Sequence, residues 1–153
     1  NDAFTPAEML RIASVESGGK LDAVSPKKSD VDDGYLGMMQ LGKRYVQDAF
    51  KEFNFTIPKG DKQIGIDEMG DDDIRKVRLN PLLSMKVAMS LLNGKMADTY
   101  PDKIARLIRY NAGNPAAMAY QNTLNINHPA IPQESKDYVK KIIGVKKYKE
   151  MYA

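Results

Sequence analysis

The chain has 153 residues, of which 42% are hydrophobic and 28% are charged, and its formal net charge is +3. This length suits one domain with a real hydrophobic core, and the composition is ordinary for a globular protein. No apolar run approaches the length needed to cross a bilayer, so the sequence excludes an integral membrane protein. The absence of cysteine excludes disulfides and thiolate metal sites, and with one histidine, His128 in a turn-like context, we expect no bound metal.

The first predicted helix starts at Thr5, which can cap it, with Pro6 at the first helical position and Glu8 completing a capping box. Apolar residues then recur at helical spacing, and Glu16 falls on or beside this buried stripe. The two glycines that follow, at positions 18 and 19, should end the helix. Because burying an unpaired charge is costly, a carboxylate at this place is unusual. Glu16 is therefore the leading candidate for a functional residue.

The next stretch alternates between irregular and helical patterns. Residues 18–40 are rich in Gly, Ser, Pro and Asp, which predicts irregular structure, and residues 43–53 form an amphipathic helical pattern. Residues 55–70 are predicted to be a loop with a short extended piece near Ile64 and Ile66. A brief helix should follow through Val77, capped by Asp71 or Asp72.

The second half of the chain reads as consecutive helices. Asn80 and Pro81 form a cap-plus-proline start, and the helix after them is apolar on most sides, which predicts a central buried helix. Further helices are predicted over residues 102–109, 114–121, 133–145 and 146–152. The pattern therefore predicts a mainly α fold in a single domain covering residues 1–153.

Three short motifs follow Glu16 along the chain. They are Gly37-Met38-Met39-Gln40, Tyr110-Asn111-Ala112-Gly113 and Tyr138-Val139. Gly37 would permit close backbone approach, and Gln40 offers a donor and an acceptor. Tyr110 offers an aromatic face for stacking, and Asn111 offers an amide for hydrogen bonding. Each motif alone is typical of core packing or of a helix end, so only their joint occurrence is informative.

Glu16 and the three motifs, in this order, resemble the lysozyme-like lytic transglycosylases, which are related in fold and motifs to goose-type lysozymes. The resemblance spans roughly residues 5–152, with Met38 where the family has Leu and Arg109 where Ala is usual. It implies a mainly α, lysozyme-like single domain with a substrate groove between two lobes. It also implies cleavage of peptidoglycan between N-acetylmuramic acid and N-acetylglucosamine, with a 1,6-anhydro-muramoyl product and no cofactor.

The resemblance also assigns roles to individual residues. Glu16 becomes the single catalytic acid/base, and the Tyr138 hydroxyl would hydrogen-bond it by analogy. The residues expected to line the site or to bind and orient the substrate are Ser17, Met38, Met39, Gln40, Tyr110, Asn111 and Tyr138.

Two alternatives remain open at this point. Residues 27–35 add several residues to the common pattern, and Asp30, Asp32 or Asp33 could supply the second carboxylate of a goose-type hydrolase. An inverting hydrolase needs that carboxylate ~6.5–9.5 Å from the acid. A solvated, turn-rich loop is the favoured interpretation of these aspartates. The other alternative is a non-catalytic module that binds glycan.

The expected partner is the glycan strand of peptidoglycan. A surface with six lysines between residues 136 and 149 could approach an anionic polymer, although a solvated helix face explains it as well. No nucleic-acid-binding motif is present, so no nucleic-acid partner is expected. Asn1 is not an initiator methionine and no signal peptide is recognisable, so we expect a processed product, or part of a larger protein or envelope-penetrating assembly. The setting would be the bacterial periplasm or cell envelope, or a phage virion or tail.

Overall fold

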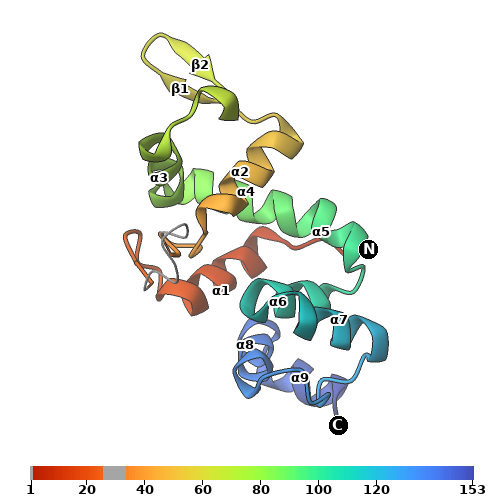
Figure 1. Cartoon of the computed structure of the whole chain (residues 1–153). Coiled ribbons are helices and arrows are strands. Elements are labelled where there is room, and N and C mark those ends of the chain that lie inside the picture. The colour runs from red at the N-terminus through yellow and green to blue at the C-terminus, as the bar shows by residue number, and fades with distance from the viewer. Residues whose placement is uncertain (1, 26–33) are drawn as a thin grey trace. The chain divides into compact units, whose positions relative to one another are not determined.

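A computed structural model describes residues 2–25 and 34–153 of the chain (Figure 1). Helices dominate these residues, which confirms the expected mainly α fold. The chain divides into two compact units, one formed by residues 1–15 and 92–153 and the other by residues 16–91. Each unit is described here by itself, and the single domain over residues 1–153 stays a prediction.

Helix α1 (Pro6–Ser17) begins as the sequence predicts. The Thr5 hydroxyl accepts a hydrogen bond from the Glu8 backbone N–H at 3.3 Å, and the Glu8 carboxylate accepts one from the Thr5 N–H at 3.0 Å. This reciprocal capping box fixes the first turn. The expected stripe is also present, because Met9, Ile12 and Ala13 are buried and Glu16 is half-buried.

The unit of residues 16–91 contains helices α2, α3 and most of α4, together with a small hairpin. Helix α2 has the predicted bounds, Lys43–Phe53, and packs against α3 (Asp71–Leu79). Strands β1 (Ile57–Lys59) and β2 (Lys62–Ile64) pair antiparallel, and a 3₁₀ turn covers Ile66–Glu68.

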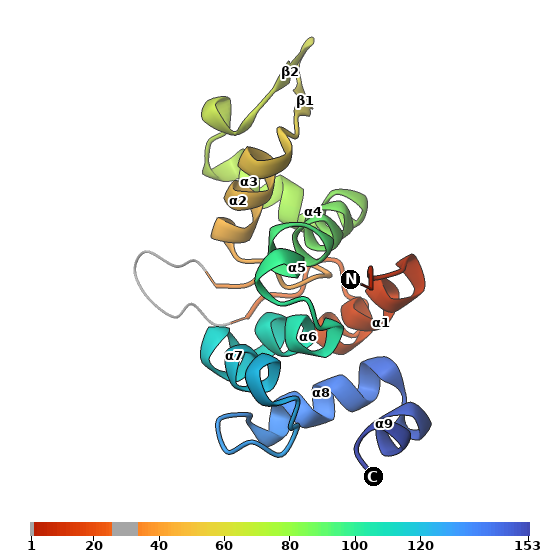
Figure 2. The same ribbon diagram turned by 90° about the vertical axis from the view of Figure 1, so that its right-hand side faces the viewer.

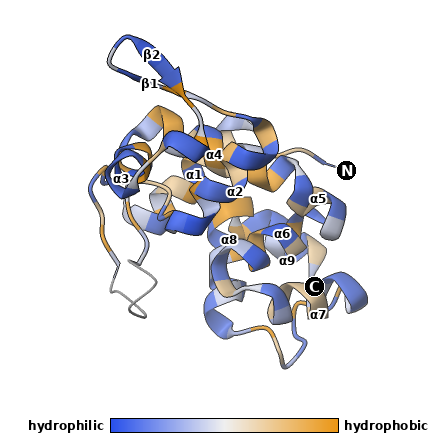
Figure 3. Ribbon diagram, turned by 45° about the horizontal axis from the view of Figure 1, so that its top comes forward, coloured by the Kyte–Doolittle hydropathy of each residue, from blue (hydrophilic) through white to orange (hydrophobic). Residues whose placement is uncertain are grey.

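The β1–β2 hairpin corrects in part the prediction for residues 55–70, a loop with a short extended piece near Ile64 and Ile66. Ile64 lies in β2, whereas β1 was not predicted and Ile66 begins the 3₁₀ turn. Ile57 and Ile64 pair across the two strands and are both buried, whereas the residues between them are exposed. Figure 3 shows the hydrophilic colour of β2. Each strand has three residues and only one inward-facing apolar side chain, so the alternation is too short to be recognised in the sequence.

The cap of α3 also differs from the prediction. Gly70 is the N-cap residue, and the carboxylate of Asp73 accepts hydrogen bonds from the Gly70 N–H at 3.0 Å and from Lys59 Nζ at 2.9 Å. The hydrogen bonds from Lys59 and Gly70 hold the pKa of Asp73 below its ordinary value. The prediction that Asp71 or Asp72 caps this helix was therefore wrong, because the carboxylate three residues into the helix reaches back instead.

Helix α4 (Pro81–Asn93) starts where it was expected, with the Asn80 side chain accepting a hydrogen bond from the Leu83 N–H at 3.0 Å. Its burial is incomplete, because Leu82 is 82% exposed, although most of its other positions are buried or half-buried. The buried positions follow helical spacing on one side of the helix: Ser84, Val87, Ala88, Leu91 and Leu92.

The other unit is built from α5 (Lys95–Thr99), α6 (Lys103–Ala112), α7 (Asn114–Thr123), α8 (Gln133–Ile143) and α9 (Val145–Met151). Helix α6 packs against α7 and α8, and α8 packs against α9 (Figure 2). The short α5 was not predicted, α6 ends three residues later than expected, and α7 runs two residues further. Helix α8 ends two residues early because Gly144, at φ +96°, stops it.

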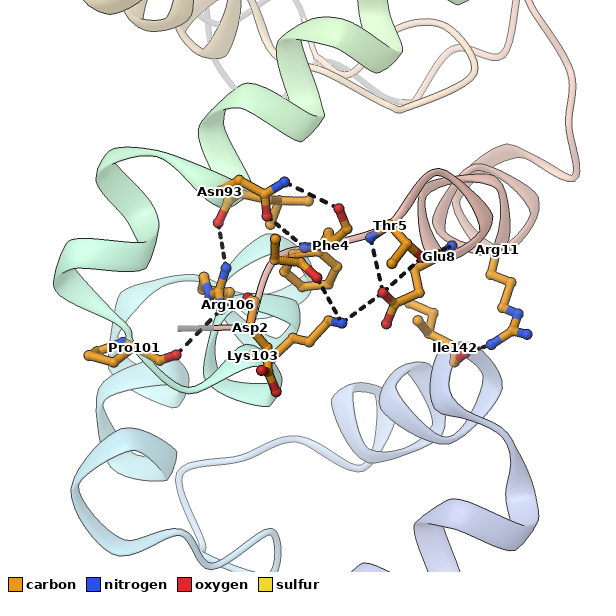
Figure 4. Close-up of polar contacts among 12 residues, drawn as sticks. Asp2, Phe4, Thr5, Glu8, Arg11, Asn93, Pro101, Lys103, Arg106 and Ile142 are labelled. Atoms are coloured by element: carbon orange, nitrogen blue, oxygen red, sulfur yellow. Dashed lines mark hydrogen bonds and ion pairs between the residues drawn. The ribbon is translucent and has the colours of Figure 1, made fainter.

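The backbone of the segment before α1 is hydrogen-bonded by side chains of this unit (Figure 4). The Phe4 N–H donates to Asn93 Oδ1 at 2.7 Å, and Asn93 Nδ2 donates to the Phe4 carbonyl at 3.2 Å. The buried guanidinium of Arg106 donates to the carbonyls of Leu92 at 2.8 Å and Asp2 at 2.6 Å. Side chains from α4 and α6 therefore provide hydrogen bonds to the backbone of residues 2–5, which lie in no helix or strand.

Glu8 links this docked segment to α6. Lys103 Nζ donates to the Glu8 carboxylate at 2.7 Å and to the Ala3 carbonyl at 3.1 Å. Burial alone would raise the pKa of Glu8, but hydrogen bonds from Lys103 and Thr5 outweigh it and hold that pKa below 4.5. The ionised carboxylate is therefore stabilised in the folded protein.

The Glu8→Gln substitution tests this linkage. Glutamine still serves a capping box but removes the charge opposite Lys103, so the variant should lose about 1 kcal/mol at pH 7. A pKa that is lower in the folded protein stabilises it above the unfolded value of 4.5, and this stabilisation is lost as pH falls through the folded value. Urea unfolding of both proteins from pH 7 to pH 3 should show their difference disappearing at low pH. A difference that stays constant would contradict the linkage.

Candidate active site

Glu16 lies one residue before the end of α1, where the chain turns sharply. The Ser17 hydroxyl accepts a hydrogen bond from the Gly19 N–H at 3.1 Å. Gly18 and Gly19 have φ +65° and +80°, and a Cβ added at either would meet nothing within 4 Å. The two glycines therefore end the helix through backbone conformation alone, which leaves the carboxylate of Glu16 at a helix end.

The Gly37–Gln40 motif forms a tight turn. The Gln40 N–H donates to the Gly37 carbonyl at 3.1 Å, and Leu36 and Leu41 exchange two backbone hydrogen bonds at 3.1 Å across its base. The Gly37 N–H donates to the Ala23 carbonyl at 2.8 Å. The motif is therefore closed on itself and tied to the segment that follows α1.

The side chain of Gln40 holds the same turn together. Its Nε2 donates to the Ala23 carbonyl at 3.0 Å and to the Gly37 carbonyl at 2.9 Å, so both amide hydrogens point at backbone acceptors. The expectation that Gln40 offers a sugar both a donor and an acceptor is thus corrected, because the Oε1 acceptor is what remains. The two methionines differ as well, since Met39 is completely buried and Met38 is half-buried.

Gly37 satisfies the expectation of close backbone approach. Its φ is +84°, and a Cβ at this position would lie 1.9 Å from the carbonyl oxygen of Arg78 at the end of α3. Both the dihedral angle and the space therefore require glycine here.

Arg78 is a residue of this region that the sequence analysis missed. It is 1% exposed, and its Nη1 lies 3.3 Å from the Gly34 carbonyl and 3.4 Å from the Leu41 carbonyl. The available signal was its position four residues after Ile74, on the buried stripe of α3. The charged pattern of that helix obscured this signal.

Asn111 has its own support in the other unit. The hydroxyl of Ser135 in α8 donates to Asn111 Oδ1 at 2.7 Å, and Ser135 is fully buried. With its oxygen engaged, Asn111 can present its amide N–H groups as donors. Tyr138 is buried one turn further along α8. The same helix therefore carries the predicted site residue Tyr138 and Ser135, which holds Asn111. The sequence analysis missed Ser135 because a buried serine has no distinctive spacing.

Helix α6 ends three residues beyond its predicted bound. Gly113, at φ +93°, stops the helix, and its N–H donates to the Arg109 carbonyl at 3.0 Å. Tyr110 and Asn111 are half-buried in the last turn. Their placement at the end of a rigid helix suits side chains that contact a ligand.

The predicted site residues fall into three groups. Glu16, Ser17, Met38, Met39 and Gln40 belong to the unit of residues 16–91, and Tyr110, Asn111 and Tyr138 belong to the other unit. The possible second carboxylates Asp30, Asp32 and Asp33 lie outside the described residues.

Neither a metal site nor a membrane span was found in the residues that were searched. Across residues 2–25 and 34–153, no three His, Cys, Asp or Glu side chains gather where they could hold a metal ion. In the same residues, no helix has the length and apolar character needed to cross a membrane.

A mainly α fold, with a glutamate at the end of an apolar helix followed by the Gly37–Gln40 turn, defines the class of lysozyme-like domains. The family model described as "Transglycosylase SLT domain" matches residues 1–128, and the chain belongs to this family. It is therefore a cell-wall-acting domain of the lytic transglycosylase type, with peptidoglycan as its substrate. The match ends before α8, so Ser135 and Tyr138 lie beyond it. No curated protein and no solved structure matches the chain.

The geometry of Gly37 gives a stability prediction with a matched control. Gly37→Ala must tolerate a positive φ and displace the Arg78 carbonyl, so the variant should lose about 3 kcal/mol of unfolding free energy. Gly18→Ala meets no atom and should lose only about 1 kcal/mol. Denaturant unfolding of the three proteins measures both values. Equal losses would show that the space beside Arg78 does not matter.

Proposed function

We propose that the chain is a lytic transglycosylase that breaks the β-1,4 bond between N-acetylmuramic acid and N-acetylglucosamine, with Glu16 as its one acid/base. The Glu16 carboxyl donates its proton to the leaving glycosidic oxygen while positive charge develops on the muramoyl sugar. The resulting carboxylate then accepts the proton of the C6 hydroxyl, whose oxygen bonds to C1. The products are a 1,6-anhydro-muramoyl end and a free N-acetylglucosamine hydroxyl, with no water consumed.

The position of Glu16 is the observation that carries this proposal. A proton donor works near neutral pH only if its surroundings disfavour the charged form. Glu16 continues an apolar stripe and is half-buried. It also lies in the last turn of α1, where the helix dipole places partial negative charge. This position at the end of an apolar helix is what supports Glu16 as the proton donor.

Two amides support recognition of the N-acetylated sugars. Gln40 offers an acceptor, because its amide hydrogens are bound to Ala23 and Gly37, and a sugar N–H or hydroxyl could donate to it. Asn111 offers donors, because its oxygen is bound to Ser135, and an acetamido carbonyl could accept from it. Each amide is held in one orientation, so Gln40 selects a ligand group that donates a hydrogen bond and Asn111 selects one that accepts it.

The remaining residues keep the roles that the family resemblance implies, each within its own unit. In the unit of residues 16–91, Ser17 and Met38 contact the substrate, and Met39 supports the turn from the core. In the other unit, Tyr110 and Tyr138 bind or orient the substrate. This chemistry needs neither a cofactor nor a second carboxylate.

The test compares two isosteric substitutions on one helix. Glu16→Gln removes the proton donor and should lower the rate of fragment release from purified peptidoglycan by at least about 10³-fold. Glu8→Gln, on the same helix, should retain the wild-type rate at pH 7 because Glu8 only caps and pairs. Circular dichroism should confirm that both variants fold. A Glu16→Gln protein that keeps a tenth of the wild-type rate would remove Glu16 from the mechanism.

A further inference from the structure

The turn that carries Met38 and Gln40 has little secondary structure of its own. Within residues 34–41 its backbone support is the Leu36–Leu41 pair and the Gln40 N–H bond to the Gly37 carbonyl. Gln40 also has a positive φ of +50°, which is unfavourable for a residue with a side chain. Contacts from outside the turn therefore contribute to this conformation: residues 23–25 bond it at Tyr35, Gly37 and Gln40, and α3 contacts it through Arg78.

Arg78 contacts the turn in two independent ways. Its guanidinium reaches the carbonyls of Gly34 and Leu41, which are the two ends of the turn. Its own carbonyl oxygen fills the space beside Gly37 in the middle of the turn, where even a methyl group would not fit. The last turn of α3 thus supports the motif at both ends and at its centre.

The chemistry of arginine suits this task. A buried guanidinium is costly unless acceptors surround it. One planar group with five donors can serve several carbonyls in a fixed geometry, which a flexible ammonium cannot reproduce. Arg78 therefore ties the two ends of the turn together through the Gly34 and Leu41 carbonyls, the second of which also accepts the Leu36 N–H.

We propose that Arg78 is a positioning residue for glycan binding: it fixes the 34–41 turn, and the turn then presents Met38 and Gln40 to the sugar. This proposal rests on the proposed function for its effect on substrate, but its effect on the turn does not depend on activity. Because Arg78 acts through a substrate-binding turn rather than on the proton donor, loss of its side chain should weaken binding more than the chemical step.

The experiment uses Arg78→Met, Arg78→Lys and the control Ile74→Ala. Methionine keeps an unbranched side chain but removes the donors, whereas lysine keeps a cation and a donor. Ile74 is buried on the same face of α3 one turn earlier, so its truncation loosens the helix without touching the guanidinium. All proteins are compared at temperatures equally far below their own Tm.

The first measurement is hydrogen exchange at the amides of Leu36 and Leu41, which bond to each other across the turn. Arg78→Met should speed this exchange at least about tenfold relative to Ile74→Ala. The second measurement is steady-state cleavage of soluble, peptide-free glycan strands. Arg78→Met should raise KM about tenfold and change kcat less than about threefold, with Arg78→Lys in between and Ile74→Ala near wild type.

Three outcomes would overturn the proposal. Unchanged exchange at Leu36 and Leu41 in Arg78→Met would show that the guanidinium does not hold the turn. Faster exchange with an unchanged KM would show that the turn does not govern binding. An equal rise of KM in Ile74→Ala would show that Arg78 affects KM only through the general stability of the protein.

If the wild-type protein cleaves no glycan, the proposed function fails, and the exchange data alone decide whether Arg78 holds the turn. If Arg78→Met does not fold, Arg78→Lys carries both measurements.

Discussion

Buried backbone polar groups must be paired, and two buried arginines of this chain donate to backbone carbonyls outside their own helices. Arg78 in one unit collects the carbonyls of Gly34 and Leu41. Arg106 in the other collects those of Asp2, Leu92 and Pro101. Both side chains are almost completely buried. The 34–41 turn and the segment before α1 are therefore each held in part by a guanidinium group, supplied by α3 and α6 respectively.

This arrangement explains how irregular segments can carry precise chemistry. Apart from Tyr138, the residues proposed to act on substrate lie at helix ends or in a tight turn, where side chains can reach a ligand. Rigid support comes from neighbouring helices: α3 for the Gly37–Gln40 turn and Ser135 of α8 for Asn111. Gln40 does both, because its amide nitrogen closes the turn while its oxygen remains available as an acceptor.

Local patterns in the sequence predicted the helix starts well. The capping box at Thr5 and Glu8, the cap at Asn80 and the helix start near residue 102 form as expected, because each depends on residues a few positions apart. Helix α5 and strand β1 were missed because they are too short for a periodic signal.

The sequence predicted the short motifs of the candidate site but not the long-range contacts that hold them. Glu16 at a glycine-terminated helix end and the close approach at Gly37 could be predicted from residue type and order. The contacts of Arg78 with the turn and of Ser135 with Asn111 join residues 24 or more positions apart, and no local rule pairs them. The orientation of the Gln40 amide was likewise set by the distant Ala23 carbonyl.

The central claim is that one glutamate suffices because the sugar's own hydroxyl replaces water as the nucleophile. The most direct test is digestion of purified peptidoglycan in water enriched in heavy oxygen, followed by mass spectrometry of the released muropeptides. We predict muramoyl ends that lack one water, match the 1,6-anhydro form and carry no heavy oxygen. Reducing muramoyl ends that contain one heavy oxygen would contradict the claim, because they would show that water attacked the bond.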